Sequence, residues 1–223
     1  MFKRKLLTAS LLTLVFSSVS YAELMSITPM DSPENLASAL VGDGIEITSV
    51  SYKGSTSSAG YFSGGKSTGI GLESGIVLTT GNVMNAEKAN ISGSTGNNMK
   101  QSGDSKLNSL IPGYKTYDAS VLSVDFVSKG TSAYFNYAFA SEEFVEWVGS
   151  SYNDVFGFHV DDENYALIPG TTTPVAINTV NQNTNSEFFN NNDPWKGGLD
   201  SPEYDLTYDG FTDVFTANIA GLI

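Results

Sequence analysis

The sequence predicts an all-β fold: a β-sandwich of the jelly-roll type with one short N-terminal helix and long polar loops. Short runs rich in Val, Ile, Tyr and Phe recur along the chain and are separated by turn residues. Glycine is frequent, at 22 of 223 residues, which favours many turns over long helices. No repeat or linker divides the chain, so we expect a single domain over residues 23–223.

Residues 1–22 are predicted to be a secretory signal peptide. They begin with Lys3, Arg4 and Lys5, continue with a mostly apolar run at 6–16, and end in Ser20-Tyr21-Ala22, which places small residues at a cleavage site. The apolar run is too short to cross a bilayer as a retained helix. We therefore expect export, cleavage after Ala22, no transmembrane segment afterwards, and a location outside the cell or on its surface.

The charge of the chain restricts its partners. The formal net charge is −13, and removal of the signal peptide takes away three basic residues, including Arg4, the one arginine. A surface this acidic repels nucleic acid and anionic membranes. Cations and neutral polar ligands such as sugars remain compatible, and the alternative is that the acidity serves solubility alone.

The chain contains no cysteine and a single histidine. Export would permit disulfides, but stability has to come from core burial, with bound calcium as a candidate aid. A Ser-His-Asp triad would depend on His159 alone, and this residue lies in the strand-like run G-F-H-V. We therefore interpret His159 as structural.

The N-terminal half is predicted to hold the helix and two strands. Ser32-Pro33 is typical of a helix start, and an apolar face follows at 36–41 before Gly42-Asp43-Gly44 ends it. Residues 45–52 alternate as a strand, residues 54–71 form a Gly- and Ser-rich loop, and 75–81 is a short buried strand. Residues 82–118 are polar and are expected to form a long surface loop.

Two motifs in this half are weak. The stretch 60–67 matches G-x-x-x-x-G-K-S, but Thr68-Gly69 cannot begin the helix that phosphate binding requires, so we interpret the match as coincidence. The sequence Asn90-Ile91-Ser92 matches a glycosylation sequon, whose meaning depends on the host.

The C-terminal half is predicted to hold the remaining strands. Residues 119–127 and a run beginning at Tyr134 are expected to form an antiparallel hairpin around Lys129-Gly130. Further strands are expected at 156–160, 165–168, 174–180 and 214–219. The polar loop at 181–203 carries Phe188, Phe189 and Trp195, which either cap the core or stack on sugar rings.

The densest group of carboxylates lies in the loop after the Tyr134 strand. Calcium takes six to eight oxygen ligands, and carboxylates with an Asn side chain are of the right kind. The predicted calcium ligands are Glu142, Glu143, Glu146, Asn153 and Asp154, with Asp161 or Asp209. The alternative is that Glu142 and Glu143 cap loop N–H groups while Asn153-Asp154 forms an Asx turn.

A second function remains open for the same loop. A secreted glycan-acting hydrolase would use two of these carboxylates as acid and base, separated by roughly 5–10 Å across a cleft. The sequence contains carboxylates but no catalytic motif, so we assign no catalytic residues.

The motif run F-A-S-E-E-F (139–144) continuing to Y-N-D-V-F-G-F (152–158) resembles the hallmark of the choice-of-anchor L domain. Four other stretches agree in order: 36–44, S-G-I-V-L-T-T-G (74–81), I-P-G (168–170) through V-A-I-N-T-V-N (175–181), and Y-D-G-F-T (208–212). The resemblance covers nearly all of the exported chain. It implies a secreted or surface-displayed bacterial domain that is usually attached through a C-terminal anchoring signal.

The end of the chain departs from that pattern. Similar domains usually continue past the Y-D-G-F-T motif with further strands. We therefore expect either that the sequence is a fragment or a shortened form, or that the last strand is missing and one sheet edge is left open. Taken together, we expect a secreted or surface binding and adhesion module, stabilised by calcium, for an extracellular glycan or protein.

Overall fold

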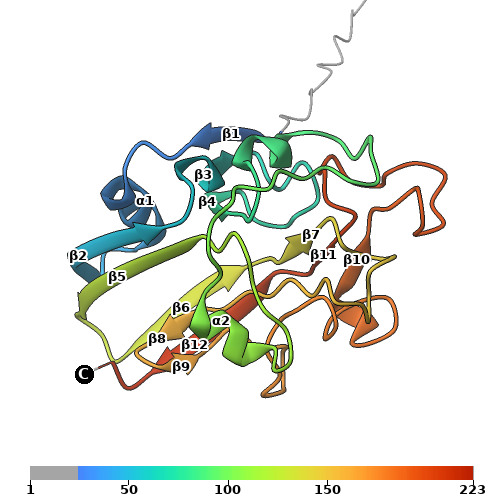
Figure 1. Cartoon of the computed structure of the whole chain (residues 1–223). Helices are drawn as coiled ribbons and strands as arrows, with labels where there is room; N and C mark the ends of the chain where they lie inside the picture. Colours follow the sequence, from blue (N-terminus) through green and yellow to red (C-terminus); the bar gives the residue numbers. More distant parts are fainter. Residues whose placement is uncertain (1–24, 223) are drawn as a thin grey trace, which may run out of the picture.

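The computed structural model describes residues 25–222, whose regular structure is mainly antiparallel β-sheet (Figure 1). One three-stranded sheet has the order β1–β3–β4 (Ser26–Pro29, Ala59–Ser63, Ser74–Leu78), and another has the order β10–β11–β7 (Phe189–Asn191, Gly210–Thr212, Ala140–Ser141). Three further strand pairs are β12–β6 (Phe215–Ala220, Ser132–Tyr137), β2–β5 (Ile45–Lys53, Val121–Ser128) and β8–β9 (His159–Val160, Glu163–Asn164). The all-β class is confirmed, while the predicted signal peptide lies outside the described residues.

The predicted N-terminal helix is present as α1 (Pro33–Leu40). Ser32 caps it, since its hydroxyl accepts a hydrogen bond from the Asn35 N–H, and Pro33 occupies the first turn, where its missing N–H costs nothing. Its residues Leu36 and Ala37 are buried. Within residues 25–222, no helix is long and apolar enough to cross a membrane.

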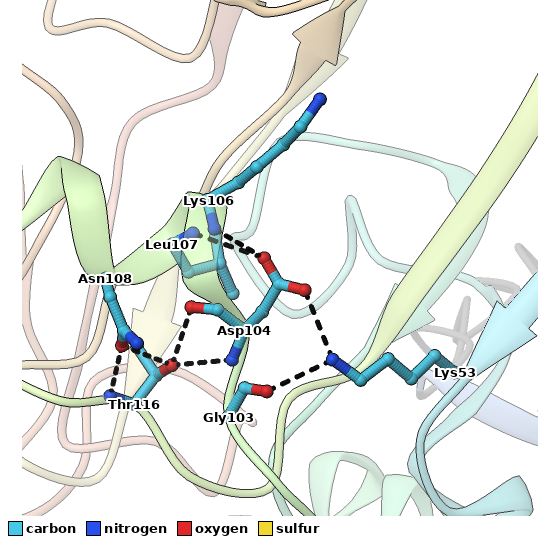
Figure 2. A network of polar contacts seen from close by, with 7 residues as sticks. All are labelled: Lys53, Gly103, Asp104, Lys106, Leu107, Asn108 and Thr116. Atoms are coloured by element: carbon cyan, nitrogen blue, oxygen red, sulfur yellow. Dashed lines mark hydrogen bonds and ion pairs between the residues drawn. The ribbon is translucent and has the colours of Figure 1, made fainter.

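The polar stretch 82–118 is more ordered than the sequence indicates. It contains a 3-10 helix at Val83–Glu87 and the short helix α2 (Ser105–Leu110). Asp104 caps α2 and also pairs with Lys53 of β2 at 3.3 Å, while Lys53 donates to the Gly103 carbonyl at 3.1 Å (Figure 2). The Thr116 hydroxyl lies 2.8 Å from Asn108 Oδ1 within the loop, and the Lys53 contacts fasten the loop to the sheet.

The predicted hairpin of residues 119–127 with the Tyr134 strand is wrong. β5 pairs with β2, from Val121 opposite Lys53 to Ser128 opposite Ile45, and β6 pairs with β12 instead. A bond from the Lys129 N–H to the Gly44 carbonyl extends the β2–β5 pairing by one residue. The short connection after it therefore leads from the β2–β5 pair to the β6–β12 pair. The partner strands lie roughly 80 residues away in sequence, and the local turn signal contains no information about them.

Other strand boundaries also differ from the prediction. The loop predicted at 54–71 contains β3, whereas 165–168 and 174–180 hold only isolated bridges such as Leu167 with Pro174. Of the strand predicted at 156–160, only the last two residues remain, as β8. The apolar side chains of these segments are buried in irregular backbone, which their hydrophobic pattern cannot distinguish from a strand.

Two groups of buried side chains form the interior. The first is aromatic and lies around β6, β12 and the irregular segment 155–180; its buried members are Tyr137, Phe139, Phe144, Ala166, Ile168, Val175, Ile177, Val180, Phe215 and Ala217. The second lies under β1 and β3; its buried members are Met25, Ile27, Phe62, Val83, Ala86, Leu206 and Phe211. β7 and β11 lie where these groups meet, and the acidic loop begins there.

Gly210 shows how tightly this junction is packed. A Cβ added there would lie 2.5 and 2.7 Å from Cε2 and Cζ of Phe189 and 3.1 Å from Cβ of Phe144. Glycine therefore suits the Y-D-G-F-T motif because the Phe189 ring and the Phe144 Cβ pack directly over its backbone.

We expect Gly210→Ala to lower the free energy of unfolding by about 1–3 kcal/mol, the usual cost of overpacking. Urea denaturation followed by fluorescence measures this. Gly42→Ala is the matched control, because nothing lies within 4 Å of a Cβ at Gly42. Equal stability of the two variants would contradict the packing argument.

Candidate functional site

The pairing of β7 with β11 brings two of the predicted acidic residues together. Ser141 lies opposite Gly210 in this antiparallel pair, so Glu142 and Asp209 are the next residues along the same register. Opposite positions of an antiparallel pair hold their side chains close together. Residues 67 apart in sequence thus become neighbours at the start of the acidic loop.

Asp209 is 0% exposed and is held by polar contacts from two other loops. Its Oδ1 accepts a hydrogen bond of 2.7 Å from Asn90 Nδ2, and its main-chain carbonyl accepts one of 2.8 Å from the Asn192 N–H. Its Oδ2 is buried with no hydrogen-bond partner. A buried carboxylate oxygen in this state costs free energy unless a cation or proton reaches it.

In Glu142, as in Asp209, only one of the two carboxylate oxygens has a hydrogen-bond partner. Its Oε2 accepts a hydrogen bond of 3.0 Å from the Thr95 N–H, and its Oε1 is buried without a partner. Burial raises the pKa of Glu142 to about 8 against the opposing effect of the Thr95 bond, and the charge of Asp209 adds to the rise. Burial likewise raises the pKa of Asp209 to about 7, although the bond from Asn90 opposes it.

The other acidic residues of the loop lie beside this pair. Burial raises the pKa of Glu143 to about 7, with the charges of Asp154 and Glu146 adding to the rise. Burial also raises the pKa of Asp154, whose Oδ2 accepts a hydrogen bond of 2.8 Å from the Ser141 hydroxyl. The ion pairs of the described residues join Lys53 to Asp104 and Lys106 to Asp162, so none of them neutralises these mutually repelling carboxylates.

Buried oxygens without a hydrogen-bond partner are concentrated here. In the part of the chain that the structure describes, five such side-chain atoms occur: Asn90 Oδ1, Glu142 Oε1, Glu146 Oε2, Gln182 Oε1 and Asp209 Oδ2. Glu142 and Glu146 belong to the loop, Asp209 follows Glu142 in the strand register, and Asn90 is bonded to Asp209. Gln182 touches the loop through a bond from its Nε2 to the Val145 carbonyl. We call Glu142, Glu143, Glu146, Asp154 and Asp209 the carboxylate cluster.

The cluster is open in the conformation described. Among residues 25–222, no three Asp, Glu or His side chains converge closely enough to enclose a metal ion. An ion at this position would have to draw the carboxylates together and take amide or main-chain oxygens as well. The chemistry of the oxygens suits a hard cation such as calcium, while the spacing requires the loop to tighten.

Residues 26–222 match the family model of the choice-of-anchor L domain. The chain belongs to this family. A search of curated proteins found no match, and a search of solved structures found none either. Membership of the choice-of-anchor L family indicates a bacterial surface-associated module, located outside the cell or on its surface.

The two most specific motifs of this choice-of-anchor L domain are hydrogen-bonded partners. F-A-S-E-E-F contains β7 and Y-D-G-F-T contains β11, and Ala140 lies opposite Phe211. The Phe139 N–H donates a further bond of 3.0 Å to the Thr212 hydroxyl oxygen. The motifs therefore build one structural unit, and the carboxylate cluster lies at its end.

Two of the predicted calcium ligands, Asp161 and Asn153, make contacts outside the carboxylate cluster of this choice-of-anchor L domain. Asp161 lies in the exposed turn between β8 and β9, where its carbonyl accepts a bond of 3.0 Å from Lys106 Nζ. Asn153 uses its Oδ1 to accept a bond of 3.0 Å from the Asn178 N–H. Of the alternative roles, Glu142 does cap a loop N–H, that of Thr95, which lies 47 residues away in sequence. Asn153 binds a distant segment rather than its own turn.

Sequence reasoning missed Asn90, Gln182 and Asp193 as parts of the site. Asn90 is 2% exposed and its Nδ2 is bonded to Asp209 and to the Asn192 carbonyl, so the sequon is a structural feature here. Asp193 is buried, caps the N–H groups of Trp195 and Lys196, and adds its charge to the field at Asp209. The available signal was that Asn90 and Asp193 are Asx residues in polar loops.

Other sequence hypotheses concern residues outside the cluster. Residues 60–63 of the G-x-x-x-x-G-K-S match belong to β3, and turns rather than a helix follow Lys66. His159 lies in β8, where burial and the charge of Lys106 lower its pKa. Phe188 and Phe189 pack against the aromatic core, whereas the ring of Trp195 lies over Gly93 and is half exposed.

Proposed function

We propose that this domain is a binding and adhesion module of the bacterial surface whose ligand loop is stabilised by calcium. The observation that carries the proposal is the set of five buried, unpartnered oxygens gathered around residues 141–154 and Asp209. Native proteins rarely leave buried polar atoms without a partner, so several such oxygens in one place support the binding of an ion there. Calcium prefers carboxylate and amide oxygens as ligands, and among the described residues no lysine forms an ion pair with these carboxylates.

The residues proposed to hold calcium are the carboxylate cluster with the amide oxygens of Asn90 and Gln182. Calcium is favoured over magnesium because it accepts six to eight ligands in irregular geometry, whereas magnesium demands a near-ideal octahedron. The ion would neutralise the mutual repulsion of the cluster. It would thereby fix the loop between β7 and residue 155, which has little regular structure of its own.

The alternative of a glycan-cleaving hydrolase has less support. Raised pKa values would suit an acid, but a cleft has to pass between the two carboxylates. Two hollows of about 340 and 320 Å³ occur on the described surface, one beside Asp161 and Leu222 and one beside Met30 and Asn82. Neither contains a residue of the carboxylate cluster, so they give no reason to prefer catalysis.

We expect millimolar CaCl₂ to raise the Tm of the metal-free protein by about 5–10 °C at pH 7.5. A ligand at about 100 times its Kd stabilises the folded state by about 2.7 kcal/mol, and about 1 kcal/mol moves a domain of this size by 2–4 °C. Differential scanning calorimetry measures the shift, with MgCl₂ at equal ionic strength as reference. Isothermal titration gives the stoichiometry.

Asp209→Asn and Glu142→Gln should abolish most of the calcium shift. Asp161→Asn is the matched control, because this carboxylate is exposed and lies away from the cluster, so the shift should remain. The proposal fails if calcium moves the Tm of the unmodified protein no more than magnesium does.

A further inference from the structure

The acidic loop also carries two exposed aromatic side chains. Trp147 is 44% exposed and Tyr152 is 55% exposed, although the loop buries Phe144 completely and packs Val145 and Val148 against the core. The rings of Trp147 and Tyr152 are 5.0 Å apart between centroids at an interplanar angle of 65°. The chain therefore holds these two rings together in solvent while their apolar neighbours are buried.

The backbone under these rings is held by specific bonds. The Trp147 N–H donates to the Glu143 carbonyl at 3.2 Å, and the Ser150 N–H donates to the Trp147 carbonyl at 2.9 Å. The Gly149 N–H donates to Asn178 Oδ1 at 2.6 Å, and Asn178 Nδ2 donates to the Tyr114 hydroxyl at 3.2 Å. The rings are thus presented by a fastened loop with amide and hydroxyl groups beside them.

We infer that Trp147 and Tyr152 form a stacking platform for a neutral glycan chain, presented by the loop that the carboxylate cluster anchors. This rests on the proposed function, because calcium at the cluster would hold Glu143, which binds the Trp147 N–H, in place. The electron-rich face of an aromatic ring attracts the C–H face of a pyranose. The Asn178 amide and nearby hydroxyls can bond the sugar hydroxyls and set its orientation.

Charge and area favour a neutral glycan over other occupants. Glu143, Glu146 and Asp154 lie in the same loop, so an anionic polysaccharide would be repelled. A stable protein interface needs about 1,000 Å² or more with a fully buried apolar centre. Among the described residues the large exposed aliphatic side chains are Ile91 and Val127, and neither belongs to this loop.

The test uses the two tryptophans of the chain. Trp195→Phe leaves Trp147 as the single tryptophan reporter, and its emission is followed in calcium during titration with cellohexaose, chitohexaose, maltohexaose and mannohexaose. We expect saturable quenching or a blue shift with at least one of these, and none with a polygalacturonate fragment. Excess EGTA at pH 7.5 should weaken the binding at least about tenfold.

The platform is checked by calorimetric titration of the responding sugar into variants whose Tm and circular dichroism match the parent. Trp147→Ala and Tyr152→Ala should each weaken binding about tenfold or more, as truncation of a central aromatic does. Tyr134→Ala is the matched control, since this tyrosine is 69% exposed on β6, and its binding should be unchanged. If Trp147→Ala misfolds, Trp147→Phe and Tyr152→Ala carry the test.

The outcomes separate this inference from the proposed function. A calcium shift in Tm with no binding of any of the four oligosaccharides overturns the platform and leaves the calcium module intact. Binding that survives both alanine variants also overturns it. Binding that needs Trp147 but is indifferent to EGTA overturns the dependence on the cation, whereas the proposed function is decided separately by the calcium shift in Tm.

Discussion

The metal-free domain is expected to be more stable at pH 5 than at pH 8, the reverse of ordinary acid denaturation. The pKa values of Glu142, Glu143 and Asp209 are raised to about 8, 7 and 7 by burial and by neighbouring carboxylates. In the unfolded chain the same groups titrate near pKa ~4. Between about pH 4 and pH 8 the folded state therefore binds more protons than the unfolded state.

The sign of the effect follows from that difference in bound protons. Stability falls with rising pH wherever the folded state holds the extra protons, so the loss runs from about pH 4 to about pH 8 and is complete above the folded pKa values. We expect a decrease of at least about 5 °C in Tm between pH 5 and pH 8 in metal-free buffer. Calorimetry on protein stripped with a chelating resin avoids the weak action of soluble chelators at low pH.

Calcium should remove this dependence, because the ion favours the ionised carboxylates that repel one another in its absence. Glu142→Gln and Asp209→Asn should each reduce the dependence of Tm on pH in the metal-free protein, since the amide side chains introduced do not titrate. Asp31 serves as the control carboxylate: it is exposed and its pKa is lowered to about 2 by bonds from Tyr61 and Asn35, so Asp31→Asn should leave the slope between pH 5 and pH 8 unchanged. A Tm that rises steadily over this interval without metal would refute the prediction.

Phe144→Ala is expected to lower the free energy of unfolding by about 3–5 kcal/mol, as truncation of a buried aromatic does. The side chain is fully buried, and its ring centroid lies 4.9 Å from that of Phe189 and 6.1 Å from that of Phe139. Domains of this kind have total stabilities of about 5–15 kcal/mol, so the loss is a large share. Urea denaturation in saturating calcium measures it.

Phe144 lies between Glu143 and Glu146 in the sequence, so its burial helps to position both carboxylates. Its removal should therefore weaken calcium binding in addition to stability, which titration at low temperature would detect in the folded fraction. Tyr134→Ala removes an aromatic ring that is exposed and should change the unfolding free energy by less than about 1 kcal/mol. Similar losses in the two variants would contradict the assignment of Phe144 to the core.

How far the sequence predicts the fold depends on how local each signal is. The helix α1 was predictable, because Ser32, Pro33 and the glycines after it define its ends within a dozen residues. The strands β2, β4, β5 and β12 were predictable from alternating or buried apolar runs. Strand pairing was not, since β6 finds its partner some 80 residues later and the nearby turn signal favoured the wrong neighbour.

The candidate site divides in the same way. The sequence by itself determined the acidic character of the loop at 142–154, the absence of arginine from residues 5–223, and the family motifs, because these depend on residue type and order alone. Only the tertiary structure decided that Asp209 joins Glu142 and that Asp161 does not. It also buried Asn90 against Asp209 and the amide oxygen of Gln182 beside the loop, because burial and cross-strand register depend on contacts between residues far apart in the chain.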